Sequence, residues 1–385
     1  KRYTKDGEQK VKEIKRDDDG TIKENLIIKG NNLLALHSLK KQFAGKVKLI
    51  YIDPPYNTGN DGFKYNDNFN HSTWLTFMKN RLEVARELLR DDGVIFVQCD
   101  DNEQAYLKVL MDEVYKKDKF IGMFMWMKTS TPPSLSKNIR KKLEYILCYT
   151  KNNIEKLNGG IVSGGDMPLL NNGNTVTTLI FPPNTVKFNL KDGKYLKHIS
   201  DRVEILEDFE VLNSFNKNKL VIKGPFKWTQ KTLDEEIKNK TFFIIKSEKF
   251  AIRYQRPGER IKTPSNLISK TECNVGTNED AKKELDLLFD NYSFDYPKPE
   301  SLISYLIEIS TLPNDIVLDY HLGSGTTAAV AHKMGRQYIG IEQMDYIETI
   351  AVERLKKVID GEQGGISKSV NWQGGGDFIY FELAK

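Results

Sequence analysis

IVLDYHLGSGTT, residues 316–327, is the most informative segment of the sequence for the fold. The apolar run before Asp319 predicts a buried strand, and the turn containing Gly323 and Gly325 then opens a helix. Glu342 ends the next apolar run, which is typical of a nucleotide-binding βαβ unit whose carboxylate accepts hydrogen bonds from a ribose diol. A third glycine at dinucleotide spacing is missing, so an adenosine ligand without phosphates fits better than a dinucleotide. An ordinary glycine turn remains the alternative.

A second candidate site, Asp53-Pro54-Pro55-Tyr56, follows the strand predicted over 47–52. Two prolines forbid both helix and sheet ladder, so the motif is rigid. The Asp53 carboxylate and the Pro54 carbonyl can accept hydrogen bonds from an exocyclic amine, which draws the nitrogen lone pair out of conjugation. The Tyr56 ring can stack on the base, which must be flipped out of a duplex. The motif therefore predicts methyl transfer to an exocyclic amine, with a proline-stiffened turn as the alternative.

Around these sites, strand-like and helix-like segments alternate, which indicates an α/β sheet. Strands are expected at 25–30, 47–52, 94–97, 120–126, 143–149, 316–319 and 338–341. Helices are expected at 31–43, 73–90, 102–115 and 301–311. Two more are expected near the carboxyl terminus, one from the glycine turn to 333 and a last one that ends at about 359.

The pattern changes near Thr150, after which the chain is polar and loop-rich and has no long helical period. We therefore predict an α+β domain inserted into an α/β catalytic domain. The expected boundaries are 1–150 for the first catalytic part, 151–275 for the insertion and 276–385 for the second catalytic part.

Composition favours a cytoplasmic globular protein, because 39% of residues are hydrophobic and no apolar run could span a bilayer. The net charge of +5 is compatible with a basic groove but does not require one. Cys99, Cys148 and Cys273 form no CxxC pair, so we expect neither disulfide nor metal site. Trp74 is one of the apolar stripe residues expected in the core, whereas His71 has no visible partner.

Together the two motifs resemble the amino-methyltransferases of bacterial restriction-modification systems, in the group whose DPPY motif precedes the recognition domain and whose glycine motif follows it. Nearly the whole chain fits this circularly permuted order. The segments 56–60, 63–67 and 374–378 are most similar to the modification (Mod) subunit of type III systems. The resemblance implies a Rossmann-like S-adenosylmethionine-dependent methyltransferase sheet with an inserted target-recognition domain at 151–275.

The resemblance also implies the substrate, the partners and the site residues. N6 of adenine in double-stranded DNA is the expected methyl acceptor, with a homodimer and a restriction (helicase/nuclease) subunit as expected partners. The implied catalytic residues are Asp53, Pro54, Pro55 and Tyr56. The implied S-adenosyl-L-methionine ligands are Lys298 and Ser301 of a KPxxL segment, Asp319, His321, Gly323, Ser324, Gly325, Thr326, Thr327 and Glu342. His321 stands where many members have phenylalanine.

Two basic stretches are candidates for contact with DNA phosphates, although solvated surface is the alternative for each residue. The candidates are Lys137, Arg140, Lys141, Lys142, Arg253, Tyr254 and Arg256.

Three other functions remain open. An N4-cytosine methyltransferase would use the same chemistry, but Asp rather than Ser at position 53 argues against it. A nucleotide-dependent oxidoreductase would leave the DPPY motif without a purpose. A non-catalytic DNA-binding subunit would predict a changed Asp53 or Tyr56, and both are present. The chain has no Walker A signature and no convincing nuclease carboxylate cluster, so DNA cleavage is expected from a partner.

Overall fold

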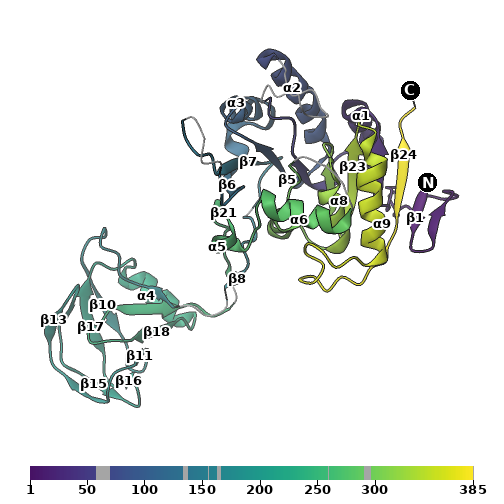
Figure 1. Cartoon of the computed structure of the whole chain (residues 1–385). Coiled ribbons are helices and arrows are strands. Elements are labelled where there is room, and N and C mark those ends of the chain that lie inside the picture. The colour runs from purple at the N-terminus through teal and green to yellow at the C-terminus, as the bar shows by residue number, and fades with distance from the viewer. Residues whose placement is uncertain are drawn as a thin grey trace. The chain divides into compact units, whose positions relative to one another are not determined.

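The computed structural model describes residues 1–57, 70–132, 138–154, 156–162, 166–258, 260–289 and 296–384. Within these ranges the chain forms two compact units (Figure 1). Unit 1 comprises Lys1–Gly159 together with Thr263–Lys385, and unit 2 is Gly160–Lys262. None of the described helices is long and apolar enough to cross a membrane. Lys137 and the segments 58–60 and 63–67, which the sequence singles out, lie outside the described residues.

Unit 1 is built on one mixed sheet of eleven strands. They are β1 (Arg2–Thr4), β2 (Gly7–Gln9), β3 (Leu26–Lys29), β4 (Val47–Ile52), β5 (Leu89–Cys99), β6 (Phe120–Met127), β7 (Leu143–Thr150), β21 (Leu267–Ile268), β22 (Ile316–Asp319), β23 (Gln337–Glu342) and β24 (Phe378–Glu382). Their order is β2-β1-β24-β3-β23-β22-β4-β5-β7-β6-β21. Neighbours from β24 to β5 run parallel, whereas β7 is antiparallel to β5 and β6. The predicted α/β class is confirmed.

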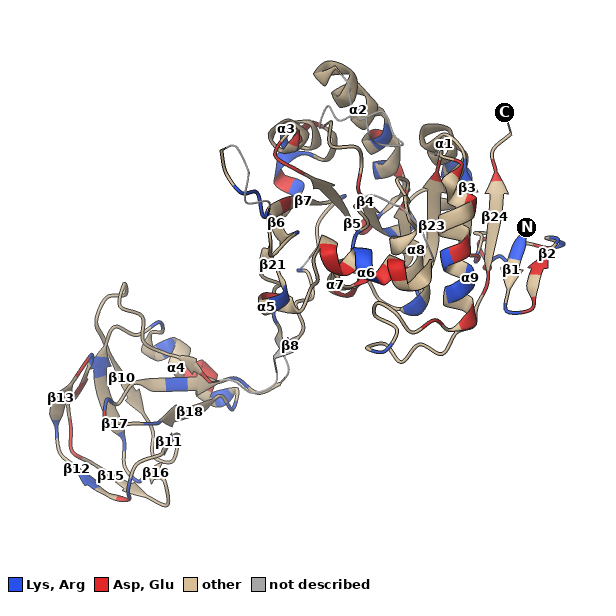
Figure 2. Cartoon of the chain, viewed as in Figure 1, with Lys and Arg blue, Asp and Glu red and all other residues tan. Residues whose placement is uncertain are grey.

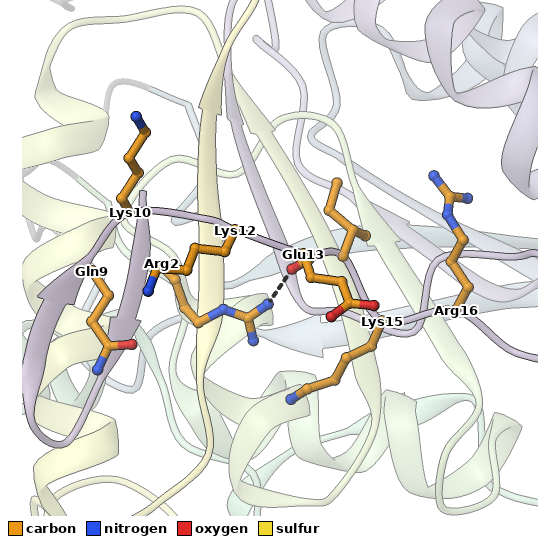
Figure 3. Close-up of a pocket in the computed structure, with 8 residues that line it drawn as sticks. Arg2, Gln9, Lys10, Lys12, Glu13, Lys15 and Arg16 are labelled. Carbon is orange, nitrogen blue, oxygen red and sulfur yellow. Dashed lines mark hydrogen bonds between the residues drawn. The ribbon is translucent and has the colours of Figure 1, made fainter.

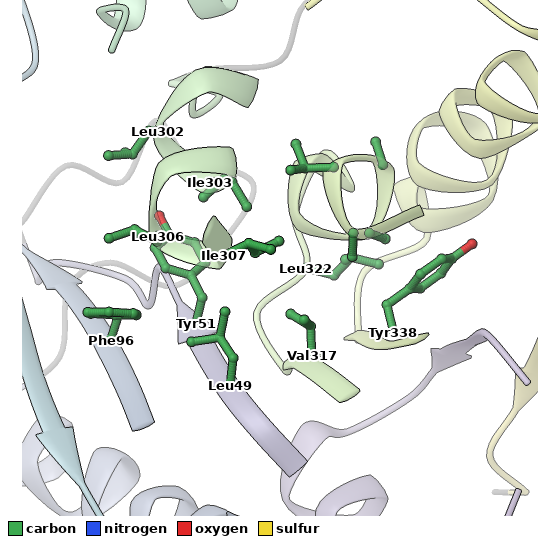
Figure 4. Packing of buried hydrophobic residues seen from close by; sticks show 14 of the residues in the cluster. Leu49, Tyr51, Phe96, Leu302, Ile303, Leu306, Ile307, Val317, Leu322 and Tyr338 are labelled. Carbon is green, nitrogen blue, oxygen red and sulfur yellow. The ribbon is translucent and has the colours of Figure 1, made fainter. Parts of the chain in front are cut away.

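Helices cover both faces of this sheet, because its central strands are apolar on both sides. They are α1 (Asn32–Phe43), α2 (His71–Leu88), α3 (Gln104–Tyr115), the 3-10 turn η1 (Lys117–Lys119), α5 (Lys270–Cys273), α6 (Asn278–Leu288), α7 (Glu300–Ser310), α8 (Thr326–Lys333), the π-turn η2 (Glu348–Val352) and α9 (Glu353–Asp360). Along β4, Leu49 and Tyr51 pack in one buried cluster with α7, α8 and α9, as Figure 4 shows for α7. Ile50 and Ile52 pack in the other with α1, α2 and α3.

The boundary between α2 and β5 differs from expectation. The helix ends at Leu88 and the strand begins at Leu89, well before the predicted start at Val94. Leu89 pairs with Val47, and after an irregularity Val94 pairs with Leu49. The ladder with β4 therefore overrides the Asp-Gly turn signal, because the strand pairing satisfies backbone groups that a turn would leave unpaired.

A buried ion cluster joins α7, α8 and α9 behind the sheet. Glu300 accepts from Lys333 Nζ at 2.8 Å and from Arg354 Nη2 at 2.9 Å. Lys333 also pairs with Glu362. Arg354 continues the chain of contacts by donating from Nη1 to Thr326 Oγ1 over 2.8 Å. Because Thr326 begins α8, this cluster fixes the helix that follows the glycine turn.

In its described residues, unit 2 is a β-rich fold with its own core and one helix, α4 (Gln230–Lys238). Its strands are β8 (Ile161–Val162), β9 (Met167–Pro168), β10 (Thr177–Phe181), β11 (Val186–Phe188), β12 (Gly193–Tyr195), β13 (His198–Ser200), β14 (Val203–Ile205), β15 (Phe209–Leu212), β16 (Phe215–Asn216), β17 (Leu220–Gly224), β18 (Phe242–Ile245), β19 (Ile252–Gln255) and β20 (Arg260–Ile261). They form sheets ordered β10-β17-β14-β13, β12-β15-β16-β11-β18-β19-β9 and β20-β8.

Unit 2 covers fewer residues than the predicted insertion of 151–275. At its far end, β21 pairs with β6 in the sheet of unit 1, and at its near end Asn158 donates from its backbone N–H to the Ile309 carbonyl. Residues 151–159 and 263–275 therefore belong to unit 1. Composition alone does not show this difference, because short polar segments can add a strand to a distant sheet.

Candidate active site

The two sequence motifs meet at one edge of the sheet in unit 1. Strands β22 and β4 are parallel neighbours, with Val317 opposite Leu49 and Leu318 opposite Ile50. Their carboxyl ends therefore lie side by side, so that Asp319 and Asp53 begin adjacent loops. In open parallel sheets, ligands bind in the crevice outside the carboxyl ends of the strands. The fold thus combines the two candidate sites into one.

Most side chains of the glycine motif are buried or form hydrogen bonds within the loop itself. The Asp319 carboxylate accepts from the His321 backbone N–H at 2.9 Å and from Thr327 Oγ1 at 2.6 Å. Burial raises the pKa of this carboxyl to about 7. Gly325 has a φ of 80°, and a Cβ there would lie 3.1 Å from Ala351, so only glycine fits. Ser324, Thr326 and Thr327 are also buried.

The residues of the motif that are accessible to a ligand lie at the turn itself. Within 319–327, a fully described stretch, only His321 and Gly323 are partly exposed. Glu342 accepts from the Gly323 backbone N–H at 3.0 Å through one oxygen, and from Gln343 and Met344 through the other. A carboxylate has about four acceptor sites, so capacity remains for hydroxyl donors. This donor and acceptor set fits the ribose of an adenosine-type cofactor.

The start of α1 completes this half of the site, and sequence reasoning missed it. Asn32 donates to the Tyr320 carbonyl at 2.9 Å and accepts from Arg81 Nε at 2.6 Å. His321 lies between Asn32 and Phe77, with 5.9 Å between the centroids of the His321 and Phe77 rings. Burial, aided by Arg81, lowers the pKa of His321 to about 3, so the imidazole is neutral. The Asn-Asn pair directly after a strand was the available signal.

The DPPY motif is held by contacts from three directions. Tyr56 donates its hydroxyl to Asp53 Oδ1 over 2.5 Å, and Trp74 donates Nε1 to the Pro55 carbonyl over 2.8 Å. Lys298 Nζ lies 2.7 Å from Asp53 Oδ2. About a quarter of the Asp53 side chain, 24%, stays exposed, so a substrate can still reach it. Burial raises the pKa of Asp53, and Lys298 opposes that rise.

The two residues of the KPxxL segment make contacts within the chain, and their contact with a cofactor stays a prediction. Lys298 contacts Asp53 of the DPPY motif. Ser301 Oγ accepts from the Gly276 backbone N–H at 2.9 Å and so fastens the chain ahead of α6 to α7. These positions follow from where α7 begins in the sheet crevice, which spacing along the chain does not specify.

Glu144 is a second residue that sequence reasoning missed. It lies within β7, is only 4% exposed and accepts from Gln98 Nε2 at 2.7 Å, and the Tyr56 hydroxyl oxygen lies 3.0 Å from its Oε2. Burial alone would raise its pKa, but the ammonium groups of Lys298 and Lys128 lower it below the ordinary value. A single acid inside an apolar strand was the signal, since buried carboxylates need partners.

Two further expectations concern Trp74 and His71. Trp74 is fully buried, which confirms its place in the core. His71, for which the sequence shows no partner, begins α2 next to the N-cap Asn70, and its Nδ1 lies 3.0 Å from Glu103. Asn57 donates to the same carboxylate at 2.8 Å. Glu103 thereby ties the start of α2 to the chain that leaves the DPPY motif.

The structure separates the candidate DNA-contact residues into groups. Arg140 and Lys142 are exposed, and Lys141 pairs with Asp101 at 3.1 Å. In unit 2, Arg253 pairs with Asp166 and Arg256 with Glu236, so both charges have acidic partners. Tyr254 is only 6% exposed and packs on Trp228, so its ring belongs to the core, against expectation. Figure 2 shows acidic and basic residues interspersed on α6 and α9.

A cavity of about 960 Å³ lies away from both motifs, beside the N-terminal strands (Figure 3). Arg2 on its wall pairs with Glu24 and Asp377 at 2.7 Å each and donates to the Glu13 carbonyl at 3.1 Å. These bonds fasten residues 1–24 to the end of the sheet at β24. The cavity is lined by Arg2, Gln9, Lys10, Lys12, Glu13, Ile14, Lys15 and Arg16, none of them from the candidate site.

A parallel α/β sheet that carries a glycine loop and a DPPY motif at the same edge defines the class of this chain, and the arrangement suits an adenosine-type ligand beside an exocyclic amine. Comparison of the sequence with family models places this chain within that class. Residues 47–353 match the DNA methylase family, and the chain belongs to it.

Three curated relatives illustrate the family. The chain is 47% identical to the probable type III restriction-modification enzyme HindVI Mod subunit of Haemophilus influenzae, over 100% of this chain and 57% of that protein. It is 32% identical to the EcoPI Mod subunit of Escherichia phage P1, over 80% and 55%. It is 28% identical to the type II methyltransferase M.KpnI of Klebsiella pneumoniae, over 78% and 75%. The chain thus spans little more than half the length of the two Mod subunits.

Proposed function

We propose that this chain transfers a methyl group from S-adenosyl-L-methionine to N6 of a flipped-out adenine in duplex DNA, as the modification component of a restriction-modification system. The observation that carries the proposal is the pairing of β22 with β4, which sets the glycine loop beside Asp53. Family membership and the Mod subunit relatives support the same activity.

The cofactor half of the site would be formed by Glu342, Gly323 and His321. Glu342 would accept from the ribose hydroxyls, Gly323 permits close approach of the backbone, and the neutral His321 ring offers a stacking surface. Asp319 acts behind them by holding the loop. When bound, S-adenosylmethionine supplies a methyl group already activated on a sulfonium.

The base half would be formed by Asp53, Pro54 and Tyr56. Fixed acceptors favour the positive charge that develops at the amine nitrogen over the neutral ground state. Asp53 presents such an acceptor because Tyr56 and Lys298 hold its two oxygens in place. Asp at position 53 favours adenine over cytosine as the acceptor base. Orientation and polarisation are therefore the contributions of the chain's own residues.

DNA recognition is assigned to unit 2 together with the exposed residues Arg140 and Lys142 of unit 1. Two relatives are named as Mod subunits, which supports a restriction subunit as partner, and homodimerisation in the cytoplasm is part of the same proposal. Arg253 and Arg256 would have to leave their acidic partners to contact phosphates. Tyr254 is left out of the proposed interface because its ring is buried.

The test is incubation of the protein with labelled S-adenosylmethionine and mixed-sequence duplex DNA, followed by mass spectrometry of the digested nucleosides. N6-methyladenine that is absent with Asp53→Ala, while cofactor binding by calorimetry persists, supports the proposal. N4-methylcytosine would overturn the acceptor base. Cofactor and DNA binding without any transfer would instead identify a non-catalytic binding subunit.

A further inference from the structure

We propose that Lys298 is a positioning residue of the base site, whose ammonium group holds the Asp53 carboxylate ionised and aimed at the target amine, with Glu144 as its second counter-ion. This inference rests on the proposed function. It changes the role that the KPxxL resemblance implies for Lys298, from a ligand of the cofactor to a support of the DPPY motif.

The position of Lys298 carries the first part of the argument. Its side chain is 7% exposed, and Nζ lies 2.7 Å from Asp53 Oδ2 and 3.7 Å from Glu144 Oε2. The same Nζ lies 5.4 Å from the centroid of the Tyr56 ring. Thr326 Oγ1 donates to the Lys298 carbonyl over 3.3 Å, which fixes the backbone. Lys298 is thus held among Asp53, Glu144 and Tyr56.

Charge balance carries the second part. Asp53 and Glu144 bring two carboxylates into a largely buried space, and Lys298 and Lys128 bring two ammonium groups. Removing Lys298 would leave Asp53 without its paired cation and Glu144 with Lys128, and like charges at short range disfavour ionisation of both carboxylates. The loss of ionisation should be larger for Asp53 than for Glu144, because Lys298 is the cation paired with Asp53.

The Tyr56 hydroxyl shows why the carboxylates need this cation. It lies 2.5 Å from Asp53 and 3.0 Å from Glu144, yet it has one proton to donate. The acid that does not receive this proton needs another donor. Lys298 donates to Asp53 and lies within ion-pair distance of Glu144, 3.7 Å away, while Gln98 at 2.7 Å and Lys128 at 3.2 Å donate to Glu144. The ammonium therefore lets Asp53 stay a pure acceptor, which polarisation of an amine requires.

The charged and titratable groups around Asp53 come from several neighbouring elements. Those that interact with Asp53 itself are Tyr51 of β4, Tyr56 of its own loop, Glu144 of β7, Lys298 before α7 and Asp319 at the end of β22. Lys128 after β6 and Asp100 after β5 interact with Glu144. Lys298 and Lys128 are the cations in this described set. Loss of Lys298 should consequently raise the pH at which Asp53 becomes protonated.

The experiment compares Lys298→Met and Lys298→Arg with the wild type and with Lys282→Met, an exposed control on α6. Each protein is assayed for kcat across pH, for KM of DNA and cofactor, and for cofactor affinity by calorimetry. For Lys298→Met we expect kcat at neutral pH to fall at least 30-fold and its acidic limb to move up by at least one pH unit. Cofactor affinity should stay within threefold, and Lys298→Arg should recover part of the rate.

A second measurement separates failure of this inference from failure of the proposed function. The carboxyl carbons of aspartate are labelled with ¹³C, the Asp53 resonance is assigned by Asp53→Asn, and its titration is followed by NMR. A higher titration midpoint in Lys298→Met supports the positioning role even if no DNA methylation is found. An unchanged midpoint overturns it, as does a parallel loss of cofactor affinity and kcat. If Lys298→Met does not fold, the same titration in Lys298→Arg and Glu144→Gln decides.

Discussion

Glu342 and Gly323 are joined by a 3.0 Å hydrogen bond from the backbone N–H of the glycine to the carboxylate, although they lie on different elements of the βαβ unit. The bond fixes the distance between the glycine loop and the end of β23. The other oxygen of the Glu342 carboxylate accepts hydrogen bonds from the backbone N–H groups of Gln343 and Met344, so both oxygens are held in place. The cofactor site is therefore shaped before any ligand arrives.

Glu342→Ala should weaken cofactor binding by at least tenfold, because it removes the ribose acceptor and the bond that sets the loop. A loss of tenfold corresponds to about 1.4 kcal/mol. Calorimetric titration with S-adenosylmethionine measures it, with the exposed Glu113→Ala as the matched control. Equal affinity in Glu342→Ala and the control would remove Glu342 from the site.

Tyr56→Phe and Tyr56→Ala should separate the two roles of this residue. The phenylalanine variant keeps the ring but loses the hydroxyl bonded near Asp53 and Glu144, so we expect roughly a tenfold lower rate. The alanine variant also loses base stacking, which contributes about 1–3 kcal/mol. Single-turnover methylation of duplex DNA gives both rates. Identical rates for the two variants would show that the ring does not hold the base.

Arg354→Met should destabilise unit 1 by about 3–5 kcal/mol, because removal of one partner leaves the buried Glu300 carboxylate with Lys333 as its remaining cation. Thr326 at the start of α8 would lose its guanidinium donor as well. Urea denaturation measures the change in the free energy of unfolding. Lys357→Met, an exposed substitution on α9, is the control, and a comparable small loss in both would contradict the prediction.

Glu284→Gln should remove part of the pH dependence of stability. Burial raises the pKa of Glu284 from 4.5 to about 7. A carboxyl whose folded pKa is raised stabilises the fold below its unfolded pKa and loses that contribution as pH rises through the folded value. The wild type should thus lose up to about 3 kcal/mol between pH 4.5 and 7, since one pKa unit corresponds to about 1.4 kcal/mol.

The glutamine variant keeps an acceptor for the Glu300 backbone N–H, which bonds Glu284 at 2.9 Å. Its unfolding free energy should therefore change less between pH 5 and pH 8 than that of the wild type, as measured by urea denaturation at both values. Asp286→Asn, an exposed substitution on the same helix, should keep the wild-type slope. A slope unchanged in Glu284→Gln would assign the effect elsewhere.

Arg140→Ala and Lys142→Ala should weaken DNA binding without regard to sequence, because both side chains are exposed and would contact phosphates. Each lost phosphate contact should lower the slope of log K against log salt by about 0.9. Fluorescence anisotropy over a salt series measures this slope, and Lys283→Ala on α6 is the control. Slopes that do not change would place the DNA elsewhere on the protein.

The local features of this protein follow from its sequence alone. The apolar run before Asp319, the glycine turn and the DPPY motif after β4 all depend on residues close in the chain, so their strand ends and turns follow from backbone chemistry. The central insertion was also visible, because its polar, loop-rich composition departs from the α/β alternation on either side. Its limits were not, since β21 joins the sheet of unit 1 only through pairing with β6.

Contacts between side chains that are distant in the sequence depend on the tertiary structure. The pairing of β22 with β4 brings the two motifs together, and the antiparallel β7 brings Glu144 to Tyr56. The approach of Lys298 to Asp53 and the burial of Tyr254 have the same origin. The physical reason is that strand order and register arise from packing of the whole core, whereas propensity and motif spacing act over a few residues.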